Sequence, residues 1–497
     1  MDPKYILKKY FGYDAFRPGQ EELIHGILSG RDALGIMPTG GGKSLCYQVP
    51  ALVLPGITLV VSPLISLMQD QVLSLKAAGV SAAYINSSLS GAQMKAVYRN
   101  LLSGQYKIVY IAPERLDYGG FGELAAKLQI SLLAVDEAHC ISQWGQDFRP
   151  SYLRILNFVE QLPVRPVLAA FTATATRQVQ EDIERILMLR DPVRVVTGFD
   201  RRNLYFEVRQ PKQKQTELLK ILSQRKNQSG IIYFSTRKKV EELCEYLCSV
   251  GYSATRYHAG LEEAERRQNQ DDFIHDNCLI MVATNAFGMG IDKSNVSFVI
   301  HYNMPQSLEA YYQEAGRAGR DGTKADCILL FSGSDAKIAQ FLIDQPPENQ
   351  NLTEEQWEAL HWRDIRRLNC MIDYCKTTRC LRKFILDYFG QQAPERCDNC
   401  GTCAVDYVPK DITKEAQMIL SCVVRIHDKL NYYVGAATVC RVLSGSKEKK
   451  LLQLGLDHLS TYGLMMNVSR ERIRDLVSHL ESEGYLITER EHQTLRP

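Results

Sequence analysis

The sequence predicts an α/β protein with two lobes built on parallel sheets, followed by a helical module and a smaller C-terminal domain. Three observations support this prediction. Short β-branched runs alternate with longer helical patterns from about residue 30 to residue 335, the alternation occurs in two series, and the pattern changes after Phe331 to helices that lead into a cysteine cluster. At roughly 100–200 residues per domain, a chain of 497 residues has room for about three to four domains.

Short apolar runs are the candidate strands. The first series comprises residues 33–37, 58–62, 108–111, 132–135 and 167–171, and the second comprises residues 231–234, 280–283, 297–300 and 327–331. Continuous apolar strands separated by helices indicate parallel sheets that are covered on both faces. The polar stretches 199–203 and 211–215 are predicted to join the lobes. The expected domains are residues 1–204, 205–340, 341–406 and 407–497.

Composition excludes several classes of protein. The 59 Lys and Arg residues nearly balance the 57 Asp and Glu residues, for a net charge of +2, so any surface for a polyanion must be local. No run of about 18 apolar residues suggests a membrane-spanning helix. The N-terminal residues lack a basic-then-apolar signal, so we expect a cytoplasmic, nucleoid-associated protein if the source is bacterial. Fourteen cysteines are few for this length, which argues against a disulfide scaffold.

A glycine-rich segment, residues 37–44, lies between a predicted strand and a helical pattern. Its three consecutive glycines allow backbone N–H groups to close around phosphate oxygens. Lys43 is expected to reach the β- and γ-phosphates and Ser44 to bind Mg²⁺, although Met37 stands where the strict P-loop pattern has its first glycine. The alternative is a glycine-rich turn without a ligand. The expected nucleotide-binding residues here are Thr39, Gly40, Gly41, Gly42, Lys43 and Ser44.

A pair of carboxylates follows the apolar run 132–135. Asp136 and Glu137 are predicted at the carboxyl end of a buried strand, where open α/β sheets bind ligands. We expect Asp136 to hold Mg²⁺, and Glu137 to orient and deprotonate the water that attacks the γ-phosphate. An Asp-Glu pair at an ordinary helix N-terminus is the alternative. His139 is not predicted as a metal ligand, because no second histidine falls at helical spacing.

These motifs, with several others in order, resemble superfamily 2 helicases and, in detail, the RecQ family. The further matching segments are residues 11–13, 16–20, 62–67, 112–115, 172–174, 233–236, 283–292 and 313–322. The resemblance spans about 330 residues and implies two RecA-like lobes that bind ATP between them. It further implies that Gln20 reads the adenine edge, that Arg17 assists and that Tyr13 stacks on the ring. An amide can form paired hydrogen bonds with an adenine edge.

Two arginines of the segment 313–322 are candidates for the arginine finger. Charge on the γ-phosphoryl oxygens in the transition state requires a planar, permanently cationic partner. We expect Arg320 to be the finger and Arg317 to support it, so that hydrolysis depends on lobe closure. For either arginine alone, a surface salt bridge is the alternative.

The segment 139–150 resembles the aromatic-rich loop of RecQ-type enzymes. Aromatic faces stack on bases with little sequence preference, worth about 1–3 kcal/mol per base. Trp144, Phe148 and Arg149 are therefore expected to contact single-stranded DNA beside the ATP site. The alternative is that Trp144 and Phe148 are core residues.

Four cysteines are predicted to bind zinc. Cys397, Cys400 and Cys403 have Cys-x-x-Cys-x-x-Cys spacing, and Cys380 on a neighbouring helix completes a tetrahedron, as in the RecQ zinc module. Alternative fourth ligands are Cys375 and Cys370. An iron–sulfur cluster and an unligated set of thiols are further alternatives.

The helices before this cluster are locally basic. Residues 361–396 contain eight Lys or Arg and four Asp or Glu, a local charge of 8 − 4 = +4. This charge fits contact with a DNA backbone, and it fits an ordinary solvated face equally well.

Residues 439–446 and 459–463 resemble the winged-helix domain of the family. A β-ribbon is expected to begin at residues 486–488 and to turn at 489–493, with His492 as the candidate residue that wedges the duplex. We expect the chain to end before the return strand is complete. No residues are left for the further C-terminal helical domain that many RecQ proteins carry. Two alternatives stay open: the protein naturally lacks that domain, or the sequence is cut short.

The resemblance implies an ATP- and Mg²⁺-dependent DNA helicase that moves 3′→5′ on single strands in recombination and repair, and that holds Zn²⁺. Expected partners are single-stranded DNA, branched or tailed duplexes and, as a further candidate, a single-strand-binding protein. The chain is expected to be a monomer. The alternatives are a superfamily 2 RNA helicase and a DNA-structure-binding module with a vestigial ATPase. The Asp-Glu-Ala-His motif also occurs in RNA helicases, whereas the cysteine cluster, aromatic loop and C-terminal domain favour DNA.

Overall fold

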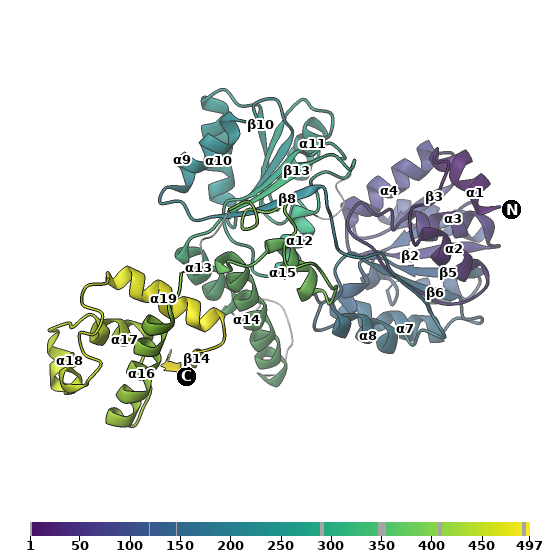
Figure 1. The fold of residues 1–497 in the computed structure, drawn as a ribbon. Helices are drawn as coiled ribbons and strands as arrows, with labels where there is room; N and C mark the ends of the chain where they lie inside the picture. Colours follow the sequence, from purple (N-terminus) through teal and green to yellow (C-terminus); the bar gives the residue numbers. More distant parts are fainter. Residues whose placement is uncertain are drawn as a thin grey trace. The chain divides into compact units, whose positions relative to one another are not determined.

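The computed structural model describes residues 2–118, 120–145, 147–288, 293–345, 354–405, 410–489 and 494–497. The chain forms two compact units, residues 1–404 and residues 405–497. In Figure 1 the first lobe of the larger unit is drawn in purple and blue and the second lobe in teal, with helices on both faces of each sheet. The expected two parallel-sheet lobes are confirmed.

The first lobe is a seven-stranded sheet with the order β3-β4-β2-β5-β6-β1-β7, in which every pairing is parallel. Its strands are β1 Ala33–Ile36, β2 Ile57–Val61, β3 Ala82–Ile85, β4 Ile108–Ile111, β5 Ile130–Val135, β6 Val167–Thr172 and β7 Val193–Val196. The sequence did not predict β3 and β7, which are the two edges of the sheet. In β7, every second residue is exposed, so the strand lacks the continuous apolar pattern of its neighbours.

The second lobe is a six-stranded parallel sheet with the order β10-β11-β9-β12-β13-β8. Its strands are β8 Leu204–Arg209, β9 Gly230–Tyr233, β10 Ala254–Tyr257, β11 Ile280–Ala283, β12 Phe298–His301 and β13 Ala325–Leu330. The unpredicted strands, β8 and β10, are again the edges. Because β8 lies between the two polar stretches that were expected to join the lobes, the connection is the short segment 199–203.

Helices cover both sheets. In the first lobe they are α1 Pro3–Ile6, α2 Gln20–Leu28, α3 Leu45–Val53, α4 Ile65–Ala77, α5 Gly91–Leu102, α6 Phe121–Ala125, α7 Arg154–Glu160 and α8 Arg177–Ile186. In the second lobe they are α9 Lys214–Ser223, α10 Arg237–Ser249, α11 Glu263–Ile274, α12 Leu308–Ala315 and α13 Gly333–Ile343. Strand β2 is buried along its whole length, as expected for a central parallel strand covered on both faces.

The helical module that follows consists of α14 Glu354–Lys376, α15 Leu381–Tyr388 and the cysteine loop. Its core is continuous with that of the second lobe, because Tyr374 packs on Tyr311 with ring centroids 5.1 Å apart. Phe389 stacks on Phe199 of the lobe connection at 4.5 Å. The module is therefore packed against the body of the larger unit.

The C-terminal unit has a separate hydrophobic core. It contains α16 Thr413–Leu430, α17 Ala436–Leu443, α18 Lys449–Gln453, α19 Arg470–Ser482, β14 Ile487–Glu489 and β15 Thr494–Arg496. The last two strands form an antiparallel ribbon. A paired return strand is therefore present, whereas an incomplete one was predicted from the sequence. His492 lies outside the described residues.

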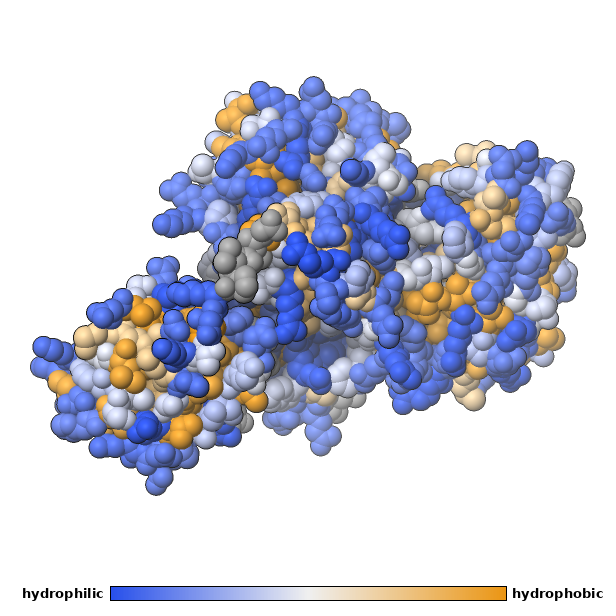
Figure 2. Space-filling view, in the orientation of Figure 1, coloured by the Kyte–Doolittle hydropathy of each residue, from blue (hydrophilic) through white to orange (hydrophobic). Residues whose placement is uncertain are grey.

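The visible face of the molecule is largely hydrophilic, with hydrophobic residues in scattered patches (Figure 2). Among the described residues, no helix has the length and apolar character needed to cross a bilayer. All fourteen cysteines are free thiols.

Candidate active site and metal centre

The glycine-rich loop joins β1 to α3 in a tight turn. Gly41 N–H donates to Pro38 O at 2.8 Å, and Leu45 N–H donates to Gly42 O at 3.2 Å. Gly40 and Gly42 both have φ of +80°, a left-handed conformation that glycine adopts without a Cβ clash. A loop of this shape at a helix N-terminus fits a polyphosphate.

The segment before α2 contacts this loop. Gln20 is 1% exposed, and its Nε2 donates to Gly42 O at 3.0 Å and to Gly41 O at 3.3 Å. Arg17 N–H donates to Gln20 Oε1 at 2.9 Å, and the Arg17 guanidinium donates to Gly40 O. Tyr13 is 51% exposed. The structure thus brings Gln20 and Arg17 onto the phosphate loop and leaves the Tyr13 ring in solvent.

The two carboxylates lie at the end of β5. Asp136 is buried, and burial together with the neighbouring Glu137 raises its pKa to about 7, against the opposing effect of Lys43. Burial disfavours ionisation of Glu137 as well, but Lys43 and His139 together lower its pKa to about 2. Lys43 therefore acts on both carboxylates, which puts the loop lysine and the carboxylate pair in one site.

The backbone of Glu137 is unusual. Its φ is +47°, in the left-handed region that residues other than glycine seldom adopt, and its side chain is 12% exposed. Among the described residues, Glu137 Oε2 accepts no hydrogen bond, although it lies 3.3 Å from His139 Nδ1. A buried carboxylate oxygen without a hydrogen-bond donor fits a group that binds a water molecule.

His139 connects the carboxylates to the end of β6. Its Nδ1 lies 2.8 Å from Thr172 Oγ1, in the matching segment 172–174. Burial disfavours the imidazolium, but contacts with Cys140 and Glu137 raise the pKa of His139 to about 10. From the sequence, His139 was considered only as a metal ligand, and that role was not predicted. Its bridging position was missed, because the spacing of 33 residues gives no local signal.

Arg317 and Arg320 reach the first lobe from the second. Arg317 is 4% exposed, and its charge contributes to the lowered pKa of Glu137 after Lys43 and His139. Arg320 lies against the phosphate loop, because a methyl group placed on Gly40 would be 3.3 Å from Arg320 Cγ. Both arginines therefore stay candidates for the finger. Arg317 acts electrostatically on Glu137, and the side chain of Arg320 lies against the phosphate loop.

The aromatic loop follows the 3₁₀ helix η3 Ala138–Ile141. Trp144 is 40% exposed and Phe148 is half-buried. The Arg149 guanidinium donates to Asp147 Oδ2, at 2.8 and 3.0 Å, and to Pro63 O at 3.0 Å. Trp144 thus offers an exposed ring, whereas Arg149 is engaged within the lobe.

Two arginines of the basic helix α14 donate hydrogen bonds to the main chain of the aromatic loop. Arg363 donates to Gln143 O, and Arg367 donates to Trp144 O at 2.8 Å. Arg367 also pairs with the buried Glu309 at 3.1 Å. Arg382 of α15 is 5% exposed. Three arginines of the local +4 charge therefore make contacts inside the protein.

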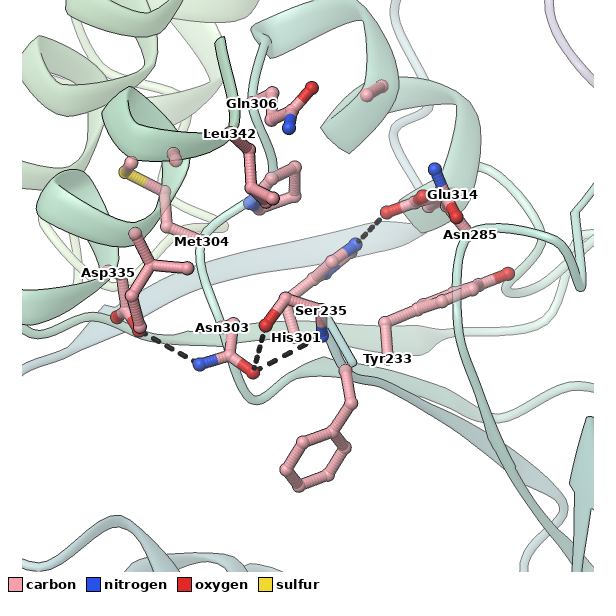
Figure 3. Close-up of a pocket in the computed structure, with 15 residues that line it drawn as sticks. Tyr233, Ser235, Asn285, His301, Asn303, Met304, Gln306, Glu314, Asp335 and Leu342 are labelled. Carbon is pink, nitrogen blue, oxygen red and sulfur yellow. Dashed lines mark hydrogen bonds and ion pairs between the residues drawn. The ribbon is translucent and has the colours of Figure 1, made fainter. Parts of the chain in front are cut away.

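A cavity of about 220 Å³ opens at the carboxyl ends of β9 and β12 (Figure 3). On one side Asn303 donates to Asp335 Oδ1 at 2.9 Å and accepts from Ser235 N–H at 3.3 Å. On the other, His301 Nε2 lies 2.8 Å from Glu314 Oε2. The cavity lies beside the matching segments 233–236 and 283–292, of which residues 289–292 are outside the described part of the chain. Its neutral groups, Ser235 and Asn303, suit a sugar–phosphate backbone, and its two carboxylates, Asp335 and Glu314, are paired with Lys214 and His301.

The four predicted cysteines come together. The Sγ atoms of Cys380, Cys397, Cys400 and Cys403 all lie within 4.8 Å of one another, and those of Cys380 and Cys400 are 3.9 Å apart. Tetrahedral zinc with Zn–S bonds of about 2.3 Å places its sulfurs about 3.8 Å apart. The set therefore has the size of a single-ion site rather than of an iron–sulfur cluster. Cys370 and Cys375, the alternative ligands, are not members of this group.

Backbone and hydroxyl donors support the thiolate form of Cys400, whereas burial raises the pKa of Cys380 and Cys397. Burial opposes ionisation of Cys400, but the Thr402 hydroxyl and nearby backbone N–H groups lower its pKa to about 6. Cys380 caps α15 by accepting from Lys383 N–H at 3.4 Å. The donor set fits Zn²⁺, which binds thiolates.

Comparison with known families matches four segments of the chain. The DEAD/DEAH box helicase family matches residues 17–183, and the helicase conserved C-terminal domain matches residues 213–322. The RecQ zinc-binding family matches residues 333–404, and the RQC domain matches residues 407–497. The chain is thus an ATP-dependent helicase with two catalytic lobes and two accessory domains.

Relatives identify the family. The ATP-dependent DNA helicase RecQ of Bacillus subtilis is 44% identical over 97% of this chain and 79% of its own length. The RecQ helicase of Haemophilus influenzae is 40% identical over 97% of this chain and 75% of its own length. The chain belongs to the RecQ family of ATP-dependent DNA helicases.

Solved structures share the fold alone. The DEAD-box helicase Mss116, bound to single-stranded RNA and UDP-BeF, superposes with a TM-score of 0.57 at 17% identity, covering 79% of this chain and 91% of that one. Dbp5 of Saccharomyces cerevisiae, bound to RNA and ADP BeF3, gives a TM-score of 0.54 at 19% identity, covering 74% of this chain and 98% of that one. The two lobes therefore share the fold of these two helicases.

Proposed function

We propose that this helicase uses Mg²⁺-dependent ATP hydrolysis to move 3′→5′ along single-stranded DNA and to unwind duplexes in recombination and repair. The observation that carries the proposal is the contact of the second lobe with the phosphate loop of the first, where the Arg320 side chain lies against Gly40. The direction of movement and the pathway rest on membership of the RecQ family. Single strands and tailed or branched duplexes are the proposed substrates.

Each residue of the site has a proposed role. The loop Thr39–Ser44 cradles the phosphates, Lys43 neutralises the β- and γ-phosphates, and Gln20, with Arg17 and Tyr13, selects adenine. Ser44 and Asp136 hold Mg²⁺, which when bound neutralises charge on the phosphates. The raised pKa of Asp136 fits this role, because a cation would favour its ionised form.

Glu137 is the proposed base. Its low pKa keeps it ionised, so that the carboxylate can accept a hydrogen bond from the attacking water. Arg317 and Arg320 come from the second lobe and stabilise charge that develops on the γ-phosphoryl group. Since the two lobes contribute to one reaction, hydrolysis is coupled to their closure.

DNA is proposed to cross both lobes. Trp144 and Phe148 supply stacking surfaces on the first lobe, with Arg149 beside them, and the cavity of Figure 3 accepts the backbone on the second lobe. The C-terminal RQC domain is proposed to contact duplex DNA, with His492 at the ribbon turn. A monomeric chain and interaction with a single-strand-binding protein complete the proposal.

An unwinding assay with 3′-tailed and 5′-tailed duplexes tests it. We expect unwinding of the 3′-tailed substrate only, dependent on ATP and Mg²⁺ and abolished by Lys43→Ala. Unwinding of the 5′-tailed substrate alone would refute the direction. Stimulation of the ATPase by RNA but not by single-stranded DNA would refute the DNA substrate, and unwinding by the Lys43→Ala variant would refute the catalytic assignment.

A further inference from the structure

The short connection between the lobes contains an arginine that bridges them. Arg201 Nη1 donates to Thr39 O of the phosphate loop at 2.9 Å and to Gly316 O of the second lobe at 3.2 Å. Arg201 Nη2 donates to Ala318 O and Gly319 O, both at 2.9 Å. One guanidinium thus contacts main-chain oxygens from both sides of the nucleotide site.

These oxygens flank the residues that matter for hydrolysis. Gly316, Ala318 and Gly319 immediately surround Arg317 and precede Arg320 in the chain. Thr39 precedes Gly40, against which the Arg320 side chain lies. The position of this guanidinium therefore sets the distance between the finger-bearing segment and the phosphate loop.

The charge of Arg201 is not used in an ion pair. In the part of the chain that the structure describes, no carboxylate pairs with Arg201, and burial lowers the pKa of its guanidinium. Four main-chain carbonyls accept from its two Nη atoms, and the Asn203 side-chain oxygen accepts from its Nε at 3.5 Å. A planar fork with several fixed donors can serve all of these acceptors at once. A lysine ammonium, a compact point charge, cannot reproduce this geometry.

The helical module fixes the connection itself. Arg382 donates to Asp200 Oδ1 at 2.8 Å and to Arg201 O at 2.7 Å. Asn399, between two of the clustered cysteines, donates to Arg202 O at 3.0 Å. The backbone that carries Arg201 is thus held from the zinc module while its side chain reaches the nucleotide site.

We propose that Arg201 is a positioning residue that holds the finger-bearing segment 316–320 against the phosphate loop, on a connection braced by the zinc-binding module. The inference rests on the proposed function, since it concerns the same ATP site. Arg201 touches carbonyls of the loops rather than the reacting atoms, so its effect is exerted through Arg317 and Arg320.

The test compares Arg201→Lys and Arg201→Met with Arg202→Met in the full chain. Arg202 is a matched control, because it is the next residue and its side chain is 92% exposed. For both Arg201 variants we expect kcat of the DNA-stimulated ATPase to fall at least tenfold, while the affinity for ADP stays within twofold. Binding of ADP with aluminium fluoride, which mimics the transferring phosphoryl group, should weaken at least tenfold. Arg202→Met should match the unsubstituted protein.

The possible outcomes distinguish failure of the Arg201 positioning role from failure of the proposed function. Equal weakening of ADP and ADP–aluminium fluoride binding, or an unchanged kcat in Arg201→Lys, would overturn the positioning role. If Arg201→Met fails to fold, which its loss of DNA binding and zinc would reveal, Arg201→Lys decides the question. If Lys43→Ala retains ATPase activity, the proposed function itself fails. If Lys43→Ala is inactive and Arg201→Lys is fully active, only this inference fails.

Discussion

Gly145 packs closely against the main chain at the start of the aromatic loop, which directly follows the carboxylate pair. A Cβ atom added there would lie 1.8 Å from His139 O and 3.0 Å from Ser142 O. Both atoms are main chain, so no flexible side chain can move aside. Gly145→Ala therefore forces the loop and the His139 segment apart.

The size of the displacement follows from these distances. Ordinary contact begins at 3.4 Å, so the separation must grow by 3.4 − 1.8 = 1.6 Å. Overpacking of this kind costs about 1–3 kcal/mol. The exposed loop should yield, because His139 is fixed in a buried network with Thr172. A misplacement of about 1 Å can reduce a rate roughly 100-fold.

Steady-state ATPase measurements with and without saturating single-stranded DNA test this prediction. In Gly145→Ala we expect the DNA-stimulated rate to fall about 100-fold, whereas the basal rate changes little because the carboxylates keep their positions. Gly91→Ala is the control, since a Cβ at Gly91 meets nothing within 4 Å. A folded Gly145→Ala protein with normal DNA stimulation would show that contact between the loop and His139 is unnecessary for coupling.

Three further predictions concern buried charges and the metal. Arg367→Met removes one partner of the Arg367–Glu309 ion pair, whose side chains are 10% and 6% exposed, so the free energy of unfolding measured in urea should fall by about 3–5 kcal/mol. Adding Glu309→Gln should restore part of the lost stability, and a loss below about 1 kcal/mol in Arg367→Met would contradict the prediction. His139→Asn removes a cation that lowers the pKa of both Asp136 and Glu137, so the acid limb of the ATPase pH profile should move to higher pH; an unmoved limb would show that His139 does not set the pKa of these carboxylates. Cys400→Ser should reduce metal content from about one zinc per chain towards none and lower the thermal midpoint; unchanged zinc would exclude this cysteine as a ligand.

The central strands of both sheets were predictable from the sequence, and the edges were not. A strand covered on both faces must be apolar throughout, as Ile108–Ile111 is. The edge strand Val193–Val196 alternates buried and exposed residues, and the edge strand Ala254–Tyr257 has one fully buried residue. These two edge strands therefore resemble surface segments in sequence, although they pair regularly in the fold.

Sites defined by local spacing were also predictable. The phosphate loop, the carboxylate pair and three of the cysteines each lie within a few residues, so their order along the chain reports their geometry. The fourth ligand, Cys380, needed the structure to separate it from Cys375 and Cys370. Contacts between distant segments left no such signal: Arg201 and Thr39 are 162 residues apart in the chain.

The local charge left a related question open, because an excess of arginine does not say which way the side chains point. Arg363, Arg367 and Arg382 bond to main-chain oxygens of other segments, and main-chain acceptors have no sequence signature. Such contacts hold the position of a segment whatever its side chains are. The helical module uses them at both the aromatic loop and the lobe connection. Loosening the module should therefore impair the response to DNA and the geometry of the nucleotide site together, even where no residue of either site is changed.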